Sequence, residues 1–320
     1  MKTNAFQPKA LVASLQSIWR NTDKEGLPVT QQAAFKYDPA FAIATPVRLW
    51  SGSLWQALPV ASGTDVYSSP DGKVWTLRTL PYSQIWRGIA HNGAGTFIAV
   101  GGTNTTQTAI STNGTTWTAG AATTSPADWG QIAYGAGTFV MVTNGTSTST
   151  QYSTNNGTTW NLGSIGATVS KIVFLNDRFI AGSFRYSTDG INWDGLTGVG
   201  TVTNFSFGNG IYLGATTSSS NTVYYSKNGV NFTAAILPVT DTWSDIGFDA
   251  PSGLFVLVAS SATGVILTSP DCITWTQRKN YDLTAGAAAA IQGPTGLAVQ
   301  QGGVLRFPDR NAVEVTYLLP

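Results

Sequence analysis

The chain is poor in the side chains that most enzymes use for chemistry. Its 320 residues contain one histidine, His91, one cysteine, Cys272, and two glutamates, Glu25 and Glu314. A lone cysteine excludes an internal disulfide, and so few His and Cys side chains exclude a zinc site built from several of them. A Ser-His-Asp triad could form only around His91. We therefore expect no metal centre and no cofactor.

Charge and long apolar runs are scarce as well. Charged residues make up 10% of the chain and nearly cancel, to a formal net charge of +1. Such a chain has no bulk electrostatic attraction to nucleic acid or to an anionic membrane. No segment approaches the 18 apolar residues of a spanning helix, and the first twenty residues lack the apolar core of a signal peptide. We expect neither nucleic-acid binding nor membrane insertion.

One short motif recurs along the chain. It has the form S-x-[DN]-G-x-x-W, and we call each copy a repeat turn. The copies read SPDGKVW, STNGTTW, STNNGTTW, STDGINW, SKNGVNF and SPDCITW, and they end at Trp75, Trp117, Trp160, Trp193, Phe232 and Trp275. Their spacing of 33 to 43 residues is typical of a stacked or radial array of structural repeats.

The residue types of the repeat turn suit a tight, stapled turn. An Asp or Asn side chain can accept hydrogen bonds from nearby backbone N–H groups, a glycine can adopt a positive φ, and the aromatic ring can pack beneath. We assign the side-chain acceptor to Asp71, Asn113, Asn156, Asp189, Asn228 and Asp271. The third copy has one extra residue, and Cys272 replaces the glycine in the last.

A second element alternates with the repeat turns. Segments such as GIAHNGAGTFIAV and QIAYGAGTFVMV read as two short strands around a Gly or Asn turn. Two hairpins in each repeat make a four-stranded antiparallel sheet, and a series of such sheets is an all-β propeller. Aromatic spacing places the first blade around Trp55, and the final segments VLRF and VEVTYLL can complete a last blade. We predict seven blades over residues 41–320, with six as the alternative.

Residues 1–40 lie outside the repeat pattern and are predicted to form an arm with a short helix. Its apolar face holds Leu11, Val12, Leu15, Ile18 and Trp19. This face could pack on the propeller's own outer surface, or it could dock onto another subunit.

The repeat turns resemble the Asp-box, or BNR, repeats of sialidases and many other propellers. Sialidase chemistry, as that resemblance implies it, uses a Tyr nucleophile with a Glu partner, an acid/base Asp and an arginine cluster. The early Arg-Ile-Pro signature is absent here, and Glu314 is the only glutamate of the propeller. We therefore expect a protein that is not an enzyme, and keep a glycan-processing enzyme of sialidase-like architecture as an alternative.

The whole chain is also similar to Asp-box propellers of tailed bacteriophages that carry YSTDGxxW repeats. This resemblance implies a virion structural protein of the tail, fibre or baseplate, made in the host cytoplasm. Its arm would attach to other virion proteins, and its propeller would bind a host surface glycan or another virion protein. A cellular propeller scaffold is the other alternative.

Strand order predicts where a ligand would bind. Repeat turns and the Gly-rich hairpin turns open on one face of the ring, and longer polar loops lie on the opposite face, the usual place for recognition. Trp86, Trp129 and Trp243 end three of these loops, with Tyr82, Arg87 and Tyr281 nearby. Indoles with polar neighbours suit a sugar, although the same tryptophans could instead wedge between blades.

Overall fold

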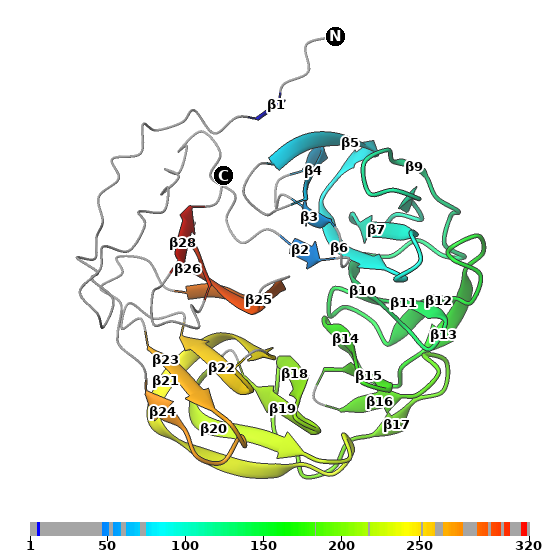
Figure 1. The fold of residues 1–320 in the computed structure, drawn as a ribbon. Coiled ribbons are helices and arrows are strands. Elements are labelled where there is room, and N and C mark those ends of the chain that lie inside the picture. Colours follow the sequence, from blue (N-terminus) through cyan, green and yellow to red (C-terminus); the bar gives the residue numbers. More distant parts are fainter. Residues whose placement is uncertain are drawn as a thin grey trace.

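The computed structural model describes the chain as an all-β ring (Figure 1). It describes residues 5–6, 47–50, 54–58, 62–70, 75–182, 184–216, 218–250, 252–259, 265–277, 287–293, 296–301, 304–307 and 315–318. The predicted arm helix, Asp71 and Tyr281 lie outside the described residues. Within these residues no helix is long and apolar enough to cross a membrane.

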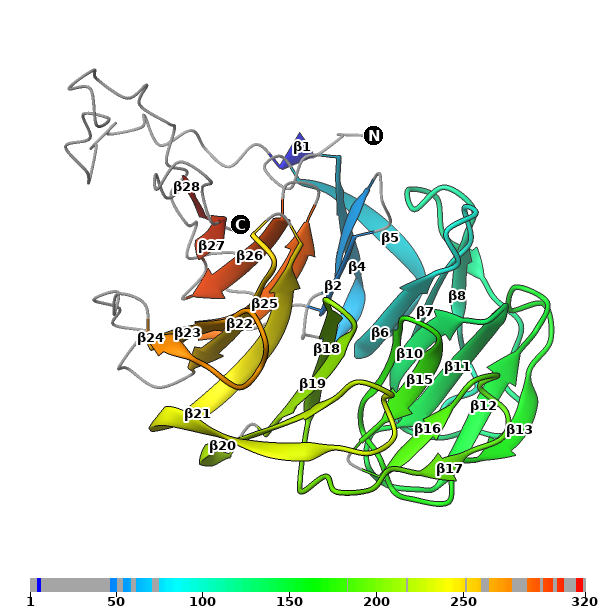
Figure 2. The same ribbon diagram turned by 60° about the horizontal axis from the view of Figure 1, so that its bottom comes forward.

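The strands form antiparallel blades that follow one another around the ring (Figures 1 and 2). The first three blades contain β2 (Val47–Trp50), β3 (Trp55–Leu58), β4 (Gly63–Ser69) and β5 (Trp75–Gln84); β6 (Trp86–His91), β7 (Phe97–Gly101), β8 (Ala109–Ser111) and β9 (Thr118–Ala119); and β10 (Trp129–Gly135), β11 (Thr138–Thr143), β12 (Ser149–Ser153) and β13 (Asn161–Ser164). The fourth contains β14 (Ile172–Leu175), β15 (Arg178–Ala181), β16 (Arg185–Ser187) and β17 (Asp194–Gly195).

Blades five and six share one long strand. They contain β18 (Asn204–Gly208), β19 (Ile211–Ala215), β20 (Ser219–Ser226), β21 (Thr233–Asp249), β22 (Leu254–Ala259), β23 (Ile266–Ser269) and β24 (Thr276–Gln277). The first part of β21 pairs with β20 as the outer strand of blade five, and the second part pairs with β22 as the inner strand of blade six. Blade seven contains β25 (Ala287–Gly293), β26 (Gly296–Gln301), β27 (Val304–Phe307) and β28 (Val315–Leu318). The described strands thus form seven blades, which confirms the predicted propeller.

Inner strands close the ring. Each inner strand contacts the next, from β2 through β6, β10, β14, β18 and β21 to β25, and β25 contacts β2 again. At the outer edge of blade one, the short strand β1 (Ala5–Phe6) pairs antiparallel with β5. The repeat pattern predicts no strand in that segment, which extends the outer edge of the first blade.

Burial follows from the stacking of blades around the axis. Every residue of β7 and of β11 is buried, because these second strands have a neighbouring blade on each side. The largest fully buried side chains include Phe139, Phe179 and Phe255, one from the second strand of each of three blades. The hydrophobic core is therefore not one central cluster, and it lies in separate clusters at the interfaces between neighbouring blades, which we call seams.

The repeat turns show one hydrogen-bond pattern. In the fourth blade the Ser187 hydroxyl oxygen accepts the Gly190 N–H at 2.8 Å. The Asp189 carboxylate accepts the N–H groups of Ile191 and Asn192, both at 2.8 Å. The turns that contain Asn113, Asn228 and Asp271 repeat these bonds. In each of these turns the serine hydroxyl also accepts the N–H of the Asp or Asn, at 3.3 Å, so two side chains satisfy four backbone N–H groups.

The third turn differs from its predicted assignment. Its acceptor is Asn155, whose Oδ1 atom accepts the Thr159 N–H at 3.0 Å. Asn156 is the extra residue, with a left-handed φ of 57°, and its side chain accepts a hydrogen bond from Asn92 of the preceding blade at 3.0 Å. The assignment to Asn156 was wrong because counting back from the glycine ignores the inserted residue.

Aromatic residues of the repeat turns point inward. Trp117, Trp160, Phe232 and Trp275 are buried, and Trp193 is partly buried. Phe97 lies edge-on to Trp117, with ring centroids 6.3 Å apart. The side chain of Trp75 lies outside the described part of the chain, and its backbone begins β5.

Each described turn also packs on the blade before it. A side chain added at Gly157 would meet Ile98 of blade two at 2.5 Å, and one added at Gly190 would meet Val140 of blade three at 2.5 Å. The Gln56 amide of blade one donates to the Gly114 carbonyl oxygen of blade two at 2.7 Å. In these turns the glycine supplies both the positive φ and the close approach to the neighbouring blade.

Cys272 occupies this glycine position in blade six. It adopts a φ of 63° and is fully buried. Burial raises the pKa of the thiol, with the nearby Asp271 carboxylate adding to the effect, so the reactive thiolate is disfavoured. The structure supports a packing role for this residue.

We expect Trp117→Ala to lower the free energy of unfolding by about 3–5 kcal/mol, because it removes a large buried side chain. Asn113→Ala removes turn hydrogen bonds only and should cost about 1 kcal/mol. Trp117→Phe is the matched control, since it keeps a ring and deletes an indole N–H that has no partner among the described residues. Urea denaturation measures the free energy of unfolding of all three variants. A loss below about 1 kcal/mol for Trp117→Ala would contradict the stabilising role of the buried ring beneath the turn.

The Asp189 carboxylate should make the fourth turn sensitive to acid. Desolvation raises its pKa, but the hydrogen bonds from the Asn192 and Ile191 N–H groups outweigh it and hold the pKa at about 2. Because the folded pKa lies below the unfolded value of about 3.9, this stabilisation is present above about pH 4 and is lost as the pH falls toward 2. Asp189→Asn keeps the acceptor without the charge. Between pH 5 and pH 2 the melting temperature should therefore fall less steeply for the variant than for the wild type. Equal slopes would refute the assignment of this acid sensitivity to Asp189.

Candidate functional site

Trp86, Trp129 and Trp243 lie inside the propeller, with exposures of 2%, 0% and 1%. Each indole N–H donates to a backbone carbonyl oxygen of the preceding blade: Trp86 to Gly63 at 3.2 Å, Trp129 to Thr105 at 3.0 Å and Trp243 to Ser220 at 2.8 Å. A buried ring with its polar atom satisfied has no face for a sugar. The prediction that these tryptophans offer a ring to a sugar was wrong, and they wedge between blades, although Trp86 and Arg87 do line a cavity of about 390 Å³.

The neighbouring predicted residues have structural contacts too. Tyr82 packs against the cluster that contains Trp86. Arg87 sits where the pairing of β6 with β7 shifts register, and it forms an ion pair with Asp128 and donates to the Gly102 carbonyl oxygen at 2.7 Å. His91 packs on Phe97, with ring centroids 4.2 Å apart, and burial lowers its pKa. His91 thus has a packing role at the end of β6.

A different set of side chains meets at the mouth of the channel. In successive blades, the pairing of the inner strand with the second strand places one equivalent residue of each inner strand at the same height along the channel. Gly88 pairs with Val100, Gln131 with Val142, Asn204 with Ala215 and Asp245 with Val258, and the Lys171 carbonyl oxygen accepts the N–H of Gly182 at 3.1 Å. Blades three to six therefore contribute Gln131, Lys171, Asn204 and Asp245 in succession, which we call the polar arc.

Hydrogen bonds join three members of the polar arc. The Lys171 ammonium donates to the Asn204 Oδ1 atom, and the Asn204 amide donates to the Asp245 carboxylate at 3.0 Å. Asp245 also accepts the N–H of Ile246 at 2.9 Å. Burial lowers the pKa of Lys171, and the Asp245 charge opposes that shift. The arc thus carries a partly desolvated cation that an amide links to a carboxylate.

Three cavities open around Lys171 on the face opposite the repeat turns. One of about 310 Å³ lies over the polar arc itself and is lined by Gln131, Lys171, Asn204 and Asp245. A second, of about 390 Å³, reaches toward Arg87 and Asn144, and the third, of about 330 Å³, lies between blades four and five. Lys171 lines all three, and they lie on the face where strand order predicted that a ligand would bind.

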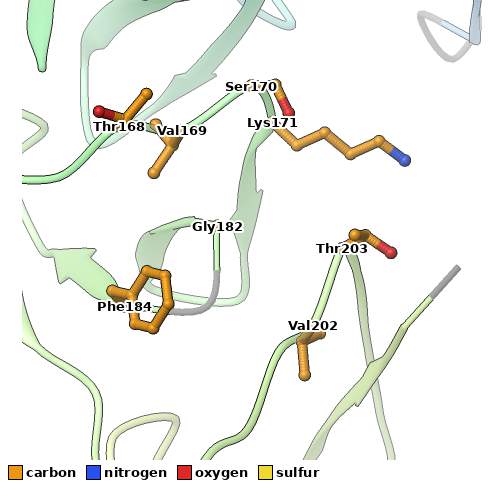
Figure 3. Close-up of a pocket in the computed structure, with 8 residues that line it drawn as sticks. All are labelled: Thr168, Val169, Ser170, Lys171, Gly182, Phe184, Val202 and Thr203. Atoms are coloured by element: carbon orange, nitrogen blue, oxygen red, sulfur yellow. The ribbon is translucent and has the colours of Figure 1, made fainter. Parts of the chain in front are cut away.

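The third cavity combines an exposed ring with hydroxyl groups (Figure 3). Phe184 is 52% exposed, and it shares the cavity with the hydroxyls of Thr168, Ser170 and Thr203. In Figure 3, Phe184 and Lys171 lie on opposite sides of Gly182, and the Lys171 side chain extends away from Phe184, above Thr203. One end of the cavity is thus apolar and the other polar.

Sequence reasoning missed these residues, although a signal existed. Each member of the polar arc comes directly before an apolar residue of its inner strand, as in Gln131 before Ile132 and Asp245 before Ile246. Aligning the hairpins at that position would have shown consecutive polar residues of different types. Among the described residues, no group of His, Cys, Asp and Glu could hold a metal ion.

No family model and no curated protein matches the sequence. Solved structures do resemble the fold. YCF48 bound to D1 peptide is 16% identical, with a TM-score of 0.58, and the match covers 74% of this chain and 82% of that one. A streptogramin B lyase is 10% identical, with a TM-score of 0.63 and coverage of 80% and 90%. The Pan2 WD40 domain of Neurospora crassa is 10% identical, with a TM-score of 0.60 and coverage of 82% and 87%. At these identities the likeness establishes that the chain has a β-propeller fold.

Proposed function

We propose that this chain is a non-enzymatic binding protein, a virion structural component of a tailed bacteriophage such as a tail, fibre or baseplate protein. Its propeller faces outward and binds a host surface glycan, or alternatively another virion protein. The observation that carries the binding role is the exposed Phe184 ring in a cavity that Thr168, Ser170, Lys171 and Thr203 also line.

The chemistry of this cavity suits a sugar. The apolar face of a pyranose stacks on an aromatic ring, and its hydroxyl groups exchange hydrogen bonds with hydroxyl and amide side chains. Phe184 provides the ring, and Thr168, Ser170 and Thr203 provide hydroxyls around it. In this proposal the ring that stacks on the sugar is therefore Phe184, and not one of the buried tryptophans.

The shared hydrogen bonds of the repeat turns support an Asp-box assignment. Five described turns use a serine hydroxyl and an Asp or Asn side chain in the same way. The resemblance of these repeats to those of phage propellers supports the virion assignment. Localisation in the virion, after synthesis in the host cytoplasm, follows from that proposal.

Two alternative functions predict different sites. A glycosidase of the usual two-carboxylate type needs two placed acidic groups, whereas Asp245 is the one carboxylate among the described residues that line the three cavities. A protein ligand has some support from YCF48, a structural neighbour whose structure contains a peptide. That likeness supports the second ligand class, a protein segment, at the same mouth.

A glycan array with the intact chain tests the binding role. We expect selective binding of at least one saccharide class, and a loss of about tenfold or more in affinity for Phe184→Ala, because the stacking surface is removed. Ile236→Ala is the control, since Ile236 is also exposed but lies on β21 away from the cavity. No glycan binding, or equal losses in both variants, would refute the proposed site.

The arm is proposed to attach the propeller to other virion proteins. Deleting residues 1–40 should leave the far-UV spectrum unchanged, because β2 to β28 close the ring by themselves and β1 adds only an outer edge strand. The same deletion should abolish incorporation into assembled particles. Normal incorporation would place attachment in the ring, and loss of folding would make residues 1–40 part of the propeller.

A further inference from the structure

We infer that the glycan bound at this mouth is acidic, with its sugar ring on Phe184 and its carboxylate at the Lys171 ammonium. This inference rests on the proposed glycan binding and specifies the class of saccharide. Lys171 and Phe184 line the same cavity of about 330 Å³. Because the Lys171 side chain extends away from Phe184 (Figure 3), the ligand of this inference is an oligosaccharide long enough to reach both.

The charges around the Phe184 cavity favour an anion. Of the described residues that line it, Lys171 is the one charged side chain, and the others are hydroxyl, apolar or glycine residues. Asp245 lines the neighbouring cavity over the polar arc, on the far side of Asn204. The negative charge nearest to Lys171 therefore comes from Asp245 in the polar arc. Among the described residues that line the Phe184 cavity there is no carboxylate to balance the ammonium.

Lys171 has hydrogen-bonding capacity to offer a ligand. An ammonium group has three donors, and Asn204 accepts one of them. Burial disfavours the charged form of this amine, and a carboxylate brought into the cavity would stabilise it. A charge-assisted hydrogen bond of this kind is stronger than a bond to a neutral sugar hydroxyl.

The second basic side chain near the mouth is already engaged. Arg87 is paired with Asp128 and donates to the Gly102 carbonyl oxygen, and it lines the cavity toward Asn144 but not the one at Phe184. Lys171 is thus the residue that would set a preference for acidic over neutral saccharides.

The test compares saccharides that differ only in the acid group. Sialyllactose, trigalacturonate and a hyaluronan tetrasaccharide are each titrated by calorimetry beside a carboxyl-reduced counterpart, in which an alcohol replaces the carboxylate. We expect at least one acid to bind about tenfold or more tightly than its reduced form, with a preference that weakens as salt is raised.

Three variants separate the roles of the residues. Lys171→Met keeps the aliphatic stem and should remove the preference for the acid while leaving the reduced sugar unaffected. Asp245→Asn keeps an acceptor for the Asn204 amide and removes a competing negative charge, so it should strengthen binding of the acid by a few-fold. Phe184→Ala should weaken both members of a pair, and Ile236→Ala neither.

The outcomes distinguish the inference from the proposed function. Equal binding of acid and reduced forms, binding of neutral glycans only, or a preference that survives Lys171→Met would overturn the inference and leave glycan binding standing. Failure of every saccharide, here and on the array, would overturn both. A peptide that binds at Lys171 when no saccharide does would favour the protein ligand instead.

Discussion

Backbone N–H groups in the turn between the third and fourth strands need partners, and one serine with one Asp or Asn supplies them. That requirement sets the rest of the architecture. With its N–H groups satisfied, the turn is compact enough for its glycine to press against the preceding blade, as Gly190 does against Val140. The aromatic side chain that follows is buried beneath it. One local turn thus shapes its own blade and fixes the distance to the next.

The candidate site uses the ring in a different way. Equivalent inner-strand positions arrive at one level of the channel mouth, and their residue types differ from blade to blade. Gln131, Lys171, Asn204 and Asp245 occupy it in blades three to six, while Gly88 occupies it in blade two. The mouth is therefore polar on one side, so a ligand would bind off the axis.

The fold could be predicted from sequence, and the site could not, for related physical reasons. Repeat turns need the same few residue types each time, so they were visible as a motif, apart from the insertion that moved the acceptor to Asn155. For Trp129 and its equivalents the sequence left two roles open, because a wedge between blades and a platform for a sugar use the same residue type, and only burial separates them. Lys171 and Asn204 share no motif, and what joins them is the register of separate strands.

Docking of each turn on the preceding blade gives the ring a direction. Gly157 meets Ile98, and Gly190 meets Val140, so in these seams the partner is encoded earlier in the chain. During synthesis the amino-terminal part of a chain emerges first and can fold first. The surface on which each turn docks is therefore synthesised before the turn itself. Blades can then fold in the order of translation, and the contact between β25 and β2 closes the ring last.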